Sequence, residues 1–165
     1  MEANRATSMP KSPSDPHRLP PPNLEDDQCV LGSVLLQQGA LAKILDLRIP
    51  DDFNREAHKI IFNAMVALFE KNEPQDIITV TNILKNKNQL DELGGPAYLA
   101  NLTDIVPVAA NITYYAKIIR SKAILRRLIQ TSTEIAARCY EEQDDIDSLV
   151  DDAEQTIFEI SHSKS

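Results

Sequence analysis

The hydrophobic pattern of the C-terminal third predicts the most regular part of the fold. Residues 111–165 contain no Gly and no Pro, the two residues that most often interrupt a helix. In the first half of this stretch, apolar residues and two serines recur at alternating four- and three-residue steps, the spacing of a coiled-coil seam. These positions are Ile118, Ser121, Leu125, Leu128, Ser132, Ile135 and Cys139. A second apolar stripe, from Ile112 to Ala123, covers only the first turns, so we expect the helix to dock near its start and continue as an arm.

A second helix is predicted after the polar residues 141–145. Its periodic apolar positions are Ile146, Leu149, Val150, Ala153, Ile157 and Ile160. Two helices joined by a short polar turn normally pack antiparallel, so residues 111–162 are predicted to form a helical hairpin. Six basic residues and one acid lie between Lys117 and Arg138, whereas nine acids and no base lie between Glu141 and Glu159. Exposed ion pairs contribute only about 0–1 kcal/mol each, so the apolar seam is expected to hold the hairpin together.

The predicted hairpin has more apolar surface than one small globule covers, so we expect it to self-associate. The residues predicted for this self-association seam are Ile118, Leu125, Leu128, Ile135, Cys139, Leu149, Val150, Ala153, Ile157 and Ile160.

Residues 23–110 show shorter amphipathic patterns separated by Gly, Pro and Asn, and predict a helical globule of about five helices. Asn23 is the predicted cap of a first helix that runs to about Gln37, with Glu25, Asp26 and Asp27 in its first turn. The other predicted helices cover residues 41–47, 54–71, 77–86 and 97–106, and the core face of the second of these is Ile61, Met65, Leu68 and Phe69. The β-branched run 77–81 is also compatible with a strand. The predicted fold class is all-α.

The first 22 residues are predicted to be a tail rather than part of the core. Six of the ten prolines lie here, among polar residues with little to bury. We expect this segment to be a disordered lead-in. The functional alternative is that it serves as a proline-rich ligand of the PxxP type.

The charge, the cysteines and the absence of long apolar runs limit the classes of function that fit this sequence. The net charge is −8, and it divides into about +1 for residues 1–22, −6 for 23–110 and −3 for 111–165. Such an acidic chain argues against a free-standing nucleic-acid binder, because phosphate contacts need clustered Lys and Arg. Cys29 and Cys139 both fall on apolar helix faces, so both are predicted to be small buried hydrophobes. No secretory leader or long apolar run is visible, which predicts a cytoplasmic protein.

The usual constellations of catalytic residues are missing from the sequence. Four glycines cannot build a Walker phosphate loop, and no Cys/His cluster has the spacing of a zinc site. The adjacent acids Asp26-Asp27, Asp51-Asp52 and Asp151-Asp152 are expected to be solvated or matched to helix dipoles. His58 has no Cys or His at ligand spacing and is interpreted as a packing residue. We therefore expect a non-catalytic chain without a metal or cofactor.

Six motifs, taken in order, carry a resemblance to a known family. They are LEDDQCVLGSVLL at 24–36, IPDDF at 49–53, HKIIFNAMVAL at 58–68, LGGPAYL at 93–99, VPVAANITYYA at 106–116 and KAILRRLI at 122–129. Together they resemble the N-terminal domain of bacterial replicative DNA helicases of the DnaB family, including its Pro-Asp-Phe loop and its Gly-Gly-x-x-Tyr-Leu turn. The resemblance covers roughly residues 20–160. A complete family member continues into a RecA-like ATPase domain, which binds ATP and Mg, and this sequence stops before it.

The resemblance implies an assembly and docking role in DNA replication. In the family, helical hairpins pair between subunits, and the dimers close into a trimer-of-dimers collar of the hexamer. Single-stranded DNA passes through the ring, and the C-terminal domain of primase docks on the outside of the collar, forming a primosome that couples priming to unwinding. By matching motif positions, the implied primase-contact candidates are Glu25, Tyr98, Ile129 and Ile135. Glu25 also fits a simple dipole-matching role, and the two isoleucines also fit the hairpin seam.

Two other functions remain open from the sequence. The helicase-binding C-terminal domain of a primase has a similar outline of helical globule plus hairpin. A nucleic-acid-binding helical module could use the basic segment Lys117–Arg138, although the acidic second helix would neutralise it.

Overall fold

The computed structural model describes residues 24–47, 52–107, 111–141 and 144–162. The tail 1–22, the predicted cap Asn23 and the turn at Pro50-Asp51 lie outside the described residues. The described elements are the α-helices α1 (Leu24–Leu36), α2 (Glu56–Glu70), α3 (Ile77–Asn86), α4 (Gly95–Ile105), α5 (Ile112–Tyr140) and α6 (Ile146–His162), with the short 3-10 turns η1 (Leu41–Lys43), η2 (Leu45–Leu47) and η4 (Asp91–Leu93).

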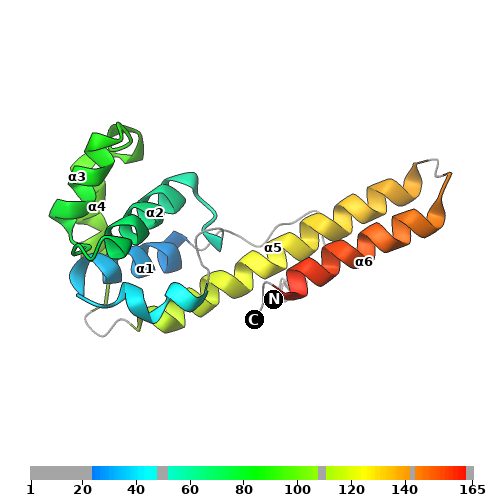
Figure 1. The fold of residues 1–165 in the computed structure, drawn as a ribbon, viewed down its shortest axis with the longest axis horizontal. Coiled ribbons are helices and arrows are strands. Elements are labelled where there is room, and N and C mark those ends of the chain that lie inside the picture. The colour runs from blue at the N-terminus through cyan, green and yellow to red at the C-terminus, as the bar shows by residue number, and fades with distance from the viewer. Residues whose placement is uncertain (1–23, 48–51, 108–110, 142–143, 163–165) are drawn as a thin grey trace, which may run out of the picture.

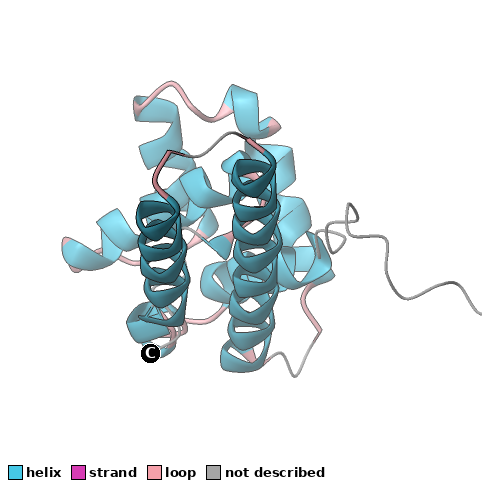
Figure 2. Ribbon diagram, turned by 90° about the vertical axis from the view of Figure 1, so that its right-hand side faces the viewer, coloured by secondary structure: helices cyan, strands magenta, loops and turns pink. Residues whose placement is uncertain are grey.

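The described chain is all-α and has two parts (Figure 1). Helices α1 to α4 form a globule, and α5 runs from this globule into an arm along which α6 returns. Figure 2 looks towards the arm and shows α5 and α6 side by side. The prediction of a helical globule followed by an antiparallel hairpin is therefore confirmed, and no strand occurs in the part of the chain that the structure describes. Residues 77–81, for which a strand was the alternative, begin α3.

Several helix ends follow directly from local sequence. Asp76 accepts a hydrogen bond from the Thr79 amide while the Thr79 hydroxyl accepts one from the Asp76 amide, which is a capping box. Asn111 caps α5 by accepting a hydrogen bond from the Tyr114 amide. The end of α2 is a Schellman motif, in which Asn72 takes a left-handed conformation and the Glu73 amide donates to the Leu68 carbonyl.

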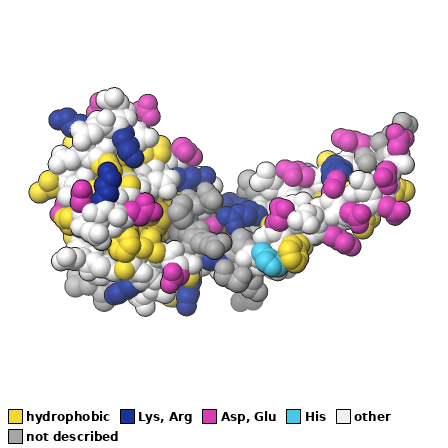
Figure 3. Space-filling model, in the orientation of Figure 1, with side chains coloured by type: hydrophobic (Ala, Val, Ile, Leu, Met, Phe, Trp, Pro, Cys, Tyr) yellow, Lys and Arg dark blue, Asp and Glu magenta, His cyan; other side chains and the backbone are white. Residues whose placement is uncertain are grey.

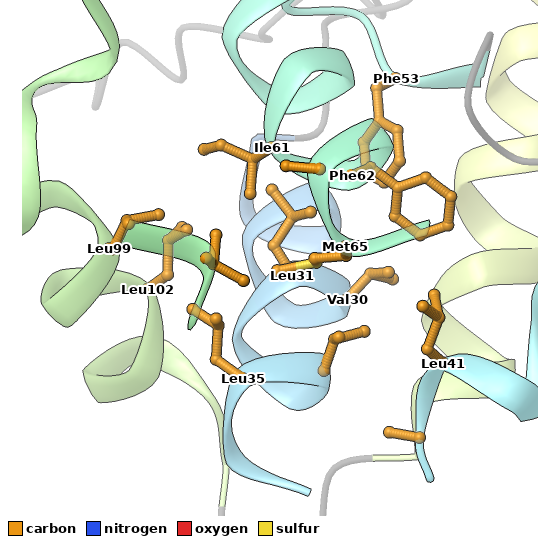
Figure 4. Close-up of a cluster of buried hydrophobic side chains, with 14 of the residues drawn as sticks. Val30, Leu31, Leu35, Leu41, Phe53, Ile61, Phe62, Met65, Leu99 and Leu102 are labelled. Atoms are coloured by element: carbon orange, nitrogen blue, oxygen red, sulfur yellow. The ribbon is translucent and has the colours of Figure 1, made fainter. Parts of the chain in front are cut away.

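The core of the globule surrounds α1, which packs against α2, α4 and α5. Figure 4 shows side chains of α1, α2 and α4 converging on one apolar cluster that includes Leu31, Phe62 and Met65. The predicted core face of α2 needs correction at one position. Phe69 is 36% exposed because it lies in the last turn, at an open groove, whereas Phe62 and His58 are fully enclosed.

The first turns of α5 dock on the globule as the sequence predicted. Ile112, Ala116, Ile119 and Ala123 are buried, and the helix continues from there into the arm. Beyond Ala123, α5 and α6 bury little against each other: Thr131, Leu149 and Ile160 are the buried positions of this part of the described arm.

Candidate functional site

Three polar side chains from three different helices meet inside the globule. The His58 Nδ1 atom lies 3.0 Å from Asp27 Oδ2, and its Nε2 atom lies 2.6 Å from the Tyr98 hydroxyl oxygen. His58 is 0% exposed and Asp27 is buried, whereas Tyr98 is partly exposed. We call these residues the Asp27–His58–Tyr98 relay. The relay gives both ring nitrogens of this fully buried imidazole a hydrogen-bond partner. A buried nitrogen without a partner would destabilise the folded state.

Each member of the relay lies in the first turn of its helix. Asp27 belongs to α1, where the N-terminal end of the helix dipole favours a carboxylate. His58 is the third residue of α2, and Tyr98 the fourth of α4. Gly94 precedes α4 with φ +99°, and a Cβ atom there would lie 3.0 Å from Tyr98 Cβ, so the glycine allows both the turn and the position of the tyrosine.

Sequence reasoning identified His58 as a packing residue but missed its two partners. They lie 31 and 40 residues away in the chain, and no local spacing connects them. The adjacent acids were expected to be solvated or matched to helix dipoles; Asp26 and Asp27 are both buried rather than solvated, and both lie in the first turn of α1, where the dipole favours acids. Asp52 is buried as well, Asp151 and Asp152 are exposed as predicted, and Asp51 lies outside the described residues. Asp26 and Asp27 are buried because the first turn of α1 lies under α2 and α5, which periodicity alone does not reveal.

A second polar cluster joins the globule to the root of the arm. The Lys122 ammonium lies 3.8 Å from Asp26 Oδ2, and the Arg127 guanidinium lies 2.7 Å from Asp52 Oδ1. Arg126 donates to the Asp52 backbone carbonyl at 2.9 Å. Burial raises the pKa of the Asp26 carboxyl, and the nearby Lys122 ammonium partly opposes this shift. These pairs fix the direction in which α5 leaves the globule.

The four predicted primase-contact residues come from three different helices. Glu25 is exposed in the first turn of α1, and Tyr98 is partly exposed on α4. Ile129 and Ile135 are half-buried and lie further along α5, in the arm. Tyr98 is therefore the only one of the four that belongs to the relay.

The arm carries apolar side chains that its own two helices leave exposed. Of the predicted self-association seam, Leu149 and Ile160 are buried, while Ile118, Leu128, Ile135 and Ala153 are half-buried. Leu125, Cys139, Val150 and Ile157 are exposed, so the prediction that Cys139 is buried is wrong. Tyr140, Ile146 and Phe158 are also exposed, Tyr140 at 92%. Figure 3 shows such side chains on the arm among acidic ones.

An open groove of about 530 Å³ lies between the last turns of α1 and α2 and the start of α3. Leu36 and Phe69 give it an apolar rim, and Glu73 and Asp76 add two carboxylates. Its lining includes no His, Cys, Lys or Arg, so the groove offers no pairing of a nucleophile with a base.

In the described ranges, no three His, Cys, Asp and Glu side chains are placed to hold a metal ion. No helix among them combines the length and apolar character that crossing a membrane requires.

Comparison with known proteins identifies the family. The model of the DnaB-like helicase N terminal domain matches residues 19–121. The replicative DNA helicase DnaC of Bacillus subtilis (strain 168) is 48% identical over 148 residues, which are 90% of this chain and 33% of the relative. The replicative DNA helicase DnaB of Geobacillus stearothermophilus is 47% identical over 147 residues, which are 89% of this chain and 32% of the relative.

A solved structure agrees with this result. The crystal structure of the N-terminal domain of DnaB helicase from Mycobacterium tuberculosis superposes with a TM-score of 0.79 at 38% identity, covering 86% of this chain and 99% of that one. The fold and the matched sequence thus define an all-α domain similar to the N-terminal domains of replicative helicases. The chain belongs to the DnaB-like helicase N-terminal domain family. It spans about a third of the length of the curated relatives named above.

Proposed function

We propose that this chain is the assembly and primase-docking region of a hexameric replicative DNA helicase that works at the bacterial replication fork. In this role it holds subunits in register around single-stranded DNA and recruits the C-terminal domain of primase, so that primer synthesis is coupled to unwinding. The region itself is non-catalytic and needs no cofactor, because ATP and Mg bind the motor domain of the complete protein. The names of the relatives, all replicative DNA helicases, support the helicase reading over the primase alternative.

The observation that carries the assembly role is the exposed apolar surface of the arm. Leu125 on α5 and Val150, Ile157 and Phe158 on α6 are each about half exposed, although they lie on a hairpin whose two helices already pack together. Isolated exposed apolar residues are common, but a run of them along both helices of one arm is typical of an interface. A second copy of the arm offers a matching surface, as in a two-fold symmetric dimer.

Molar mass from light scattering across a concentration series tests this role. The wild-type chain should grow from monomer towards dimer and higher states with concentration. Ile157→Asp changes a side chain that is 49% exposed, so it should weaken association and leave the melting temperature of the monomer nearly unchanged. Ile160→Asp is the matched comparison: its side chain is 8% exposed, so it should instead lower the melting temperature. A wild-type chain that stays monomeric at high micromolar concentration would contradict assembly through the arm alone.

The docking role rests on Tyr98, a partly exposed aromatic residue held by buried polar partners. Tyrosines with one end anchored and one face open are common in protein interfaces. Titration of this chain with the purified C-terminal domain of the cognate primase tests the role, with Tyr98→Ala expected to weaken the affinity. Leu36→Ala is a suitable control, because Leu36 is exposed at the groove and away from the relay.

A further inference from the structure

The hydrogen-bond polarity of the Asp27–His58–Tyr98 relay follows from the chemistry of its members. A carboxylate only accepts hydrogen bonds, so the His58 Nδ1 atom, 3.0 Å from Asp27, carries the hydrogen. In a neutral imidazole the other nitrogen then has a lone pair and no hydrogen. With a neutral imidazole, the Tyr98 hydroxyl, 2.6 Å from Nε2, is the donor, and its hydrogen points into the globule.

The relay also restricts the tyrosine ring. Its hydroxyl end is tied to a histidine that is 0% exposed, and the His58 and Tyr98 rings are nearly parallel at 8°. On its other side His58 meets the Phe53 ring edge-on, with the centroids 6.4 Å apart. The imidazole thus cannot rotate without losing two hydrogen bonds and a packed contact. A partly exposed ring that is fixed before a partner arrives loses less entropy on binding.

The order carboxylate, imidazole, hydroxyl also occurs in hydrolases. Here neither the groove between α1 and α2 nor the small cavity at the root of the arm is lined by His58 or Tyr98. Because His58 is 0% exposed, its imidazole is placed to hold Tyr98 rather than to exchange a proton with a substrate.

We propose that Asp27 and His58 are positioning residues for Tyr98: the relay fixes the phenol ring as a preformed aromatic contact on the docking surface and keeps the hydroxyl proton inside. This inference rests on the proposed docking of the primase C-terminal domain at Tyr98. It names two buried residues, far from one another in sequence, on which that docking depends. It also defines what the partner meets, which is the ring of Tyr98 and no hydroxyl proton.

Asp27→Asn tests the inference because it reverses the polarity of the relay without changing its shape. The asparagine side chain has an NH2 donor as well as an oxygen. With the NH2 donating to Nδ1, the imidazole hydrogen moves to Nε2, which donates to the Tyr98 oxygen and leaves the hydroxyl hydrogen pointing away from His58. Asp26→Asn is the matched control. Asp26 is the adjacent residue in the same turn and is also buried, but its partner is Lys122 on α5.

Two measurements on this chain are needed. Long-range ¹⁵N–¹H correlation spectra at pH 8 report which His58 nitrogen carries the hydrogen. The wild type and Asp26→Asn should show the Nδ1–H tautomer, and Asp27→Asn the Nε2–H tautomer. Calorimetric titration with the cognate primase C-terminal domain reports docking. Tyr98→Phe should weaken the affinity about tenfold, because it loses the hydrogen bond that anchors the ring. Asp27→Asn keeps that hydrogen bond with its direction reversed, but the hydroxyl hydrogen then faces the partner as an unpaired donor, so the affinity should again fall about tenfold. Asp26→Asn should change the affinity less than twofold.

The double variant Asp27→Asn/Tyr98→Phe separates positioning from general destabilisation. If Asp27 acts only through the Tyr98 hydroxyl, the double variant should bind as weakly as Tyr98→Phe alone. Effects that multiply, or a wild-type Nε2–H tautomer, would overturn the inference. If Asp27→Asn does not fold, Tyr98→Phe still decides, because an affinity equal to that of the wild type contradicts a role for the anchored hydroxyl.

The failure of the inference differs from the failure of the proposed function. An unchanged affinity in Tyr98→Ala would overturn docking at Tyr98, and the positioning role with it. An affinity that falls in Tyr98→Ala but stays at the wild-type value in Asp27→Asn, with the tautomer exchanged, would overturn only the positioning role.

Discussion

The guanidinium of Arg127 and the carboxylate of Asp52 lie 2.7 Å apart, although 75 residues separate them in the chain. Asp52 is almost completely buried just before α2, and Arg127 lies on α5 where the helix leaves the globule. Arg126 adds a hydrogen bond to the backbone carbonyl of the same aspartate. The direction of the arm therefore depends on one short segment before α2 as much as on the apolar docking of α5.

Removing the carboxylate of Asp52 should destabilise the chain measurably. In Asp52→Ala the partly buried Arg127 loses this ion pair, and we expect the free energy of unfolding to fall by about 1–3 kcal/mol. Asp152→Ala is the matched control, because it breaks the Arg138–Asp152 pair of 3.1 Å on the exposed arm. That loss should stay within about 1 kcal/mol. Urea unfolding of both variants makes the comparison, and equal losses would show that burial of Asp52 has no energetic role.

Gly32 lies where α1 passes close to the C-terminal end of α4. A Cβ atom at this position would collide with the backbone carbonyl of Leu102 and with the side chain of Val106. Gly32→Ala should therefore force the two helices apart and destabilise the fold by about 1–3 kcal/mol, even though alanine is the better helix former by about 1 kcal/mol. Thermal unfolding followed by circular dichroism measures the change. A variant that melts at a higher temperature than the wild type would mean that α1 and α4 are further apart than described.

The two thiols should differ strongly in reactivity. Burial raises the pKa of the Cys29 thiol, and the nearby carboxylates of Glu25 and Asp26 raise it further, whereas Cys139 is exposed on the arm. Because the thiolate is the reactive form, a disulfide reagent at pH 7.5 should modify one thiol quickly and the second only on unfolding. Cys139→Ser should remove the fast phase. If arms pair through the surface that includes Cys139, the fast rate should also fall as protein concentration rises.

The Asp26 carboxyl should make stability depend on pH. Because its pKa in the folded chain is raised above the ordinary value of 3.8, the folded state holds this proton more tightly than the unfolded chain does. The stabilisation from the protonated form is fully present below that value and is lost as pH rises through the raised pKa. The free energy of unfolding of Asp26→Asn relative to the wild type should therefore increase as the pH rises from 3.8 through the raised pKa. Urea titrations at several pH values check the sign, and a decrease over this range would contradict it.

The amount that sequence could predict differs from one part of the chain to another. Helix types and most helix ends were predictable because periodicity, capping residues such as Asp76 and Asn111, and the Gly94 turn act within a few residues. The relay was not predictable, because nothing near His58 in the chain indicates that Asp27 and Tyr98 will be its neighbours. Cys139 was misplaced because the seam spacing does not say which side of α5 will face α6.

By itself, the sequence determined that this protein is all-α, that a long helix docks near its start and continues as one strut of a hairpin, and that its family is that of the DnaB-like helicase N-terminal domain. These properties follow from local spacing and from ordered motifs. Only the tertiary structure decided which acids are buried and which partners they have. Asp26 pairs with Lys122 at the root of the arm, whereas Asp27 contacts His58, which in turn holds Tyr98. The physical reason is that polar partners are chosen by helix packing, which joins residues 31 to 96 positions apart and leaves no local pattern in the chain.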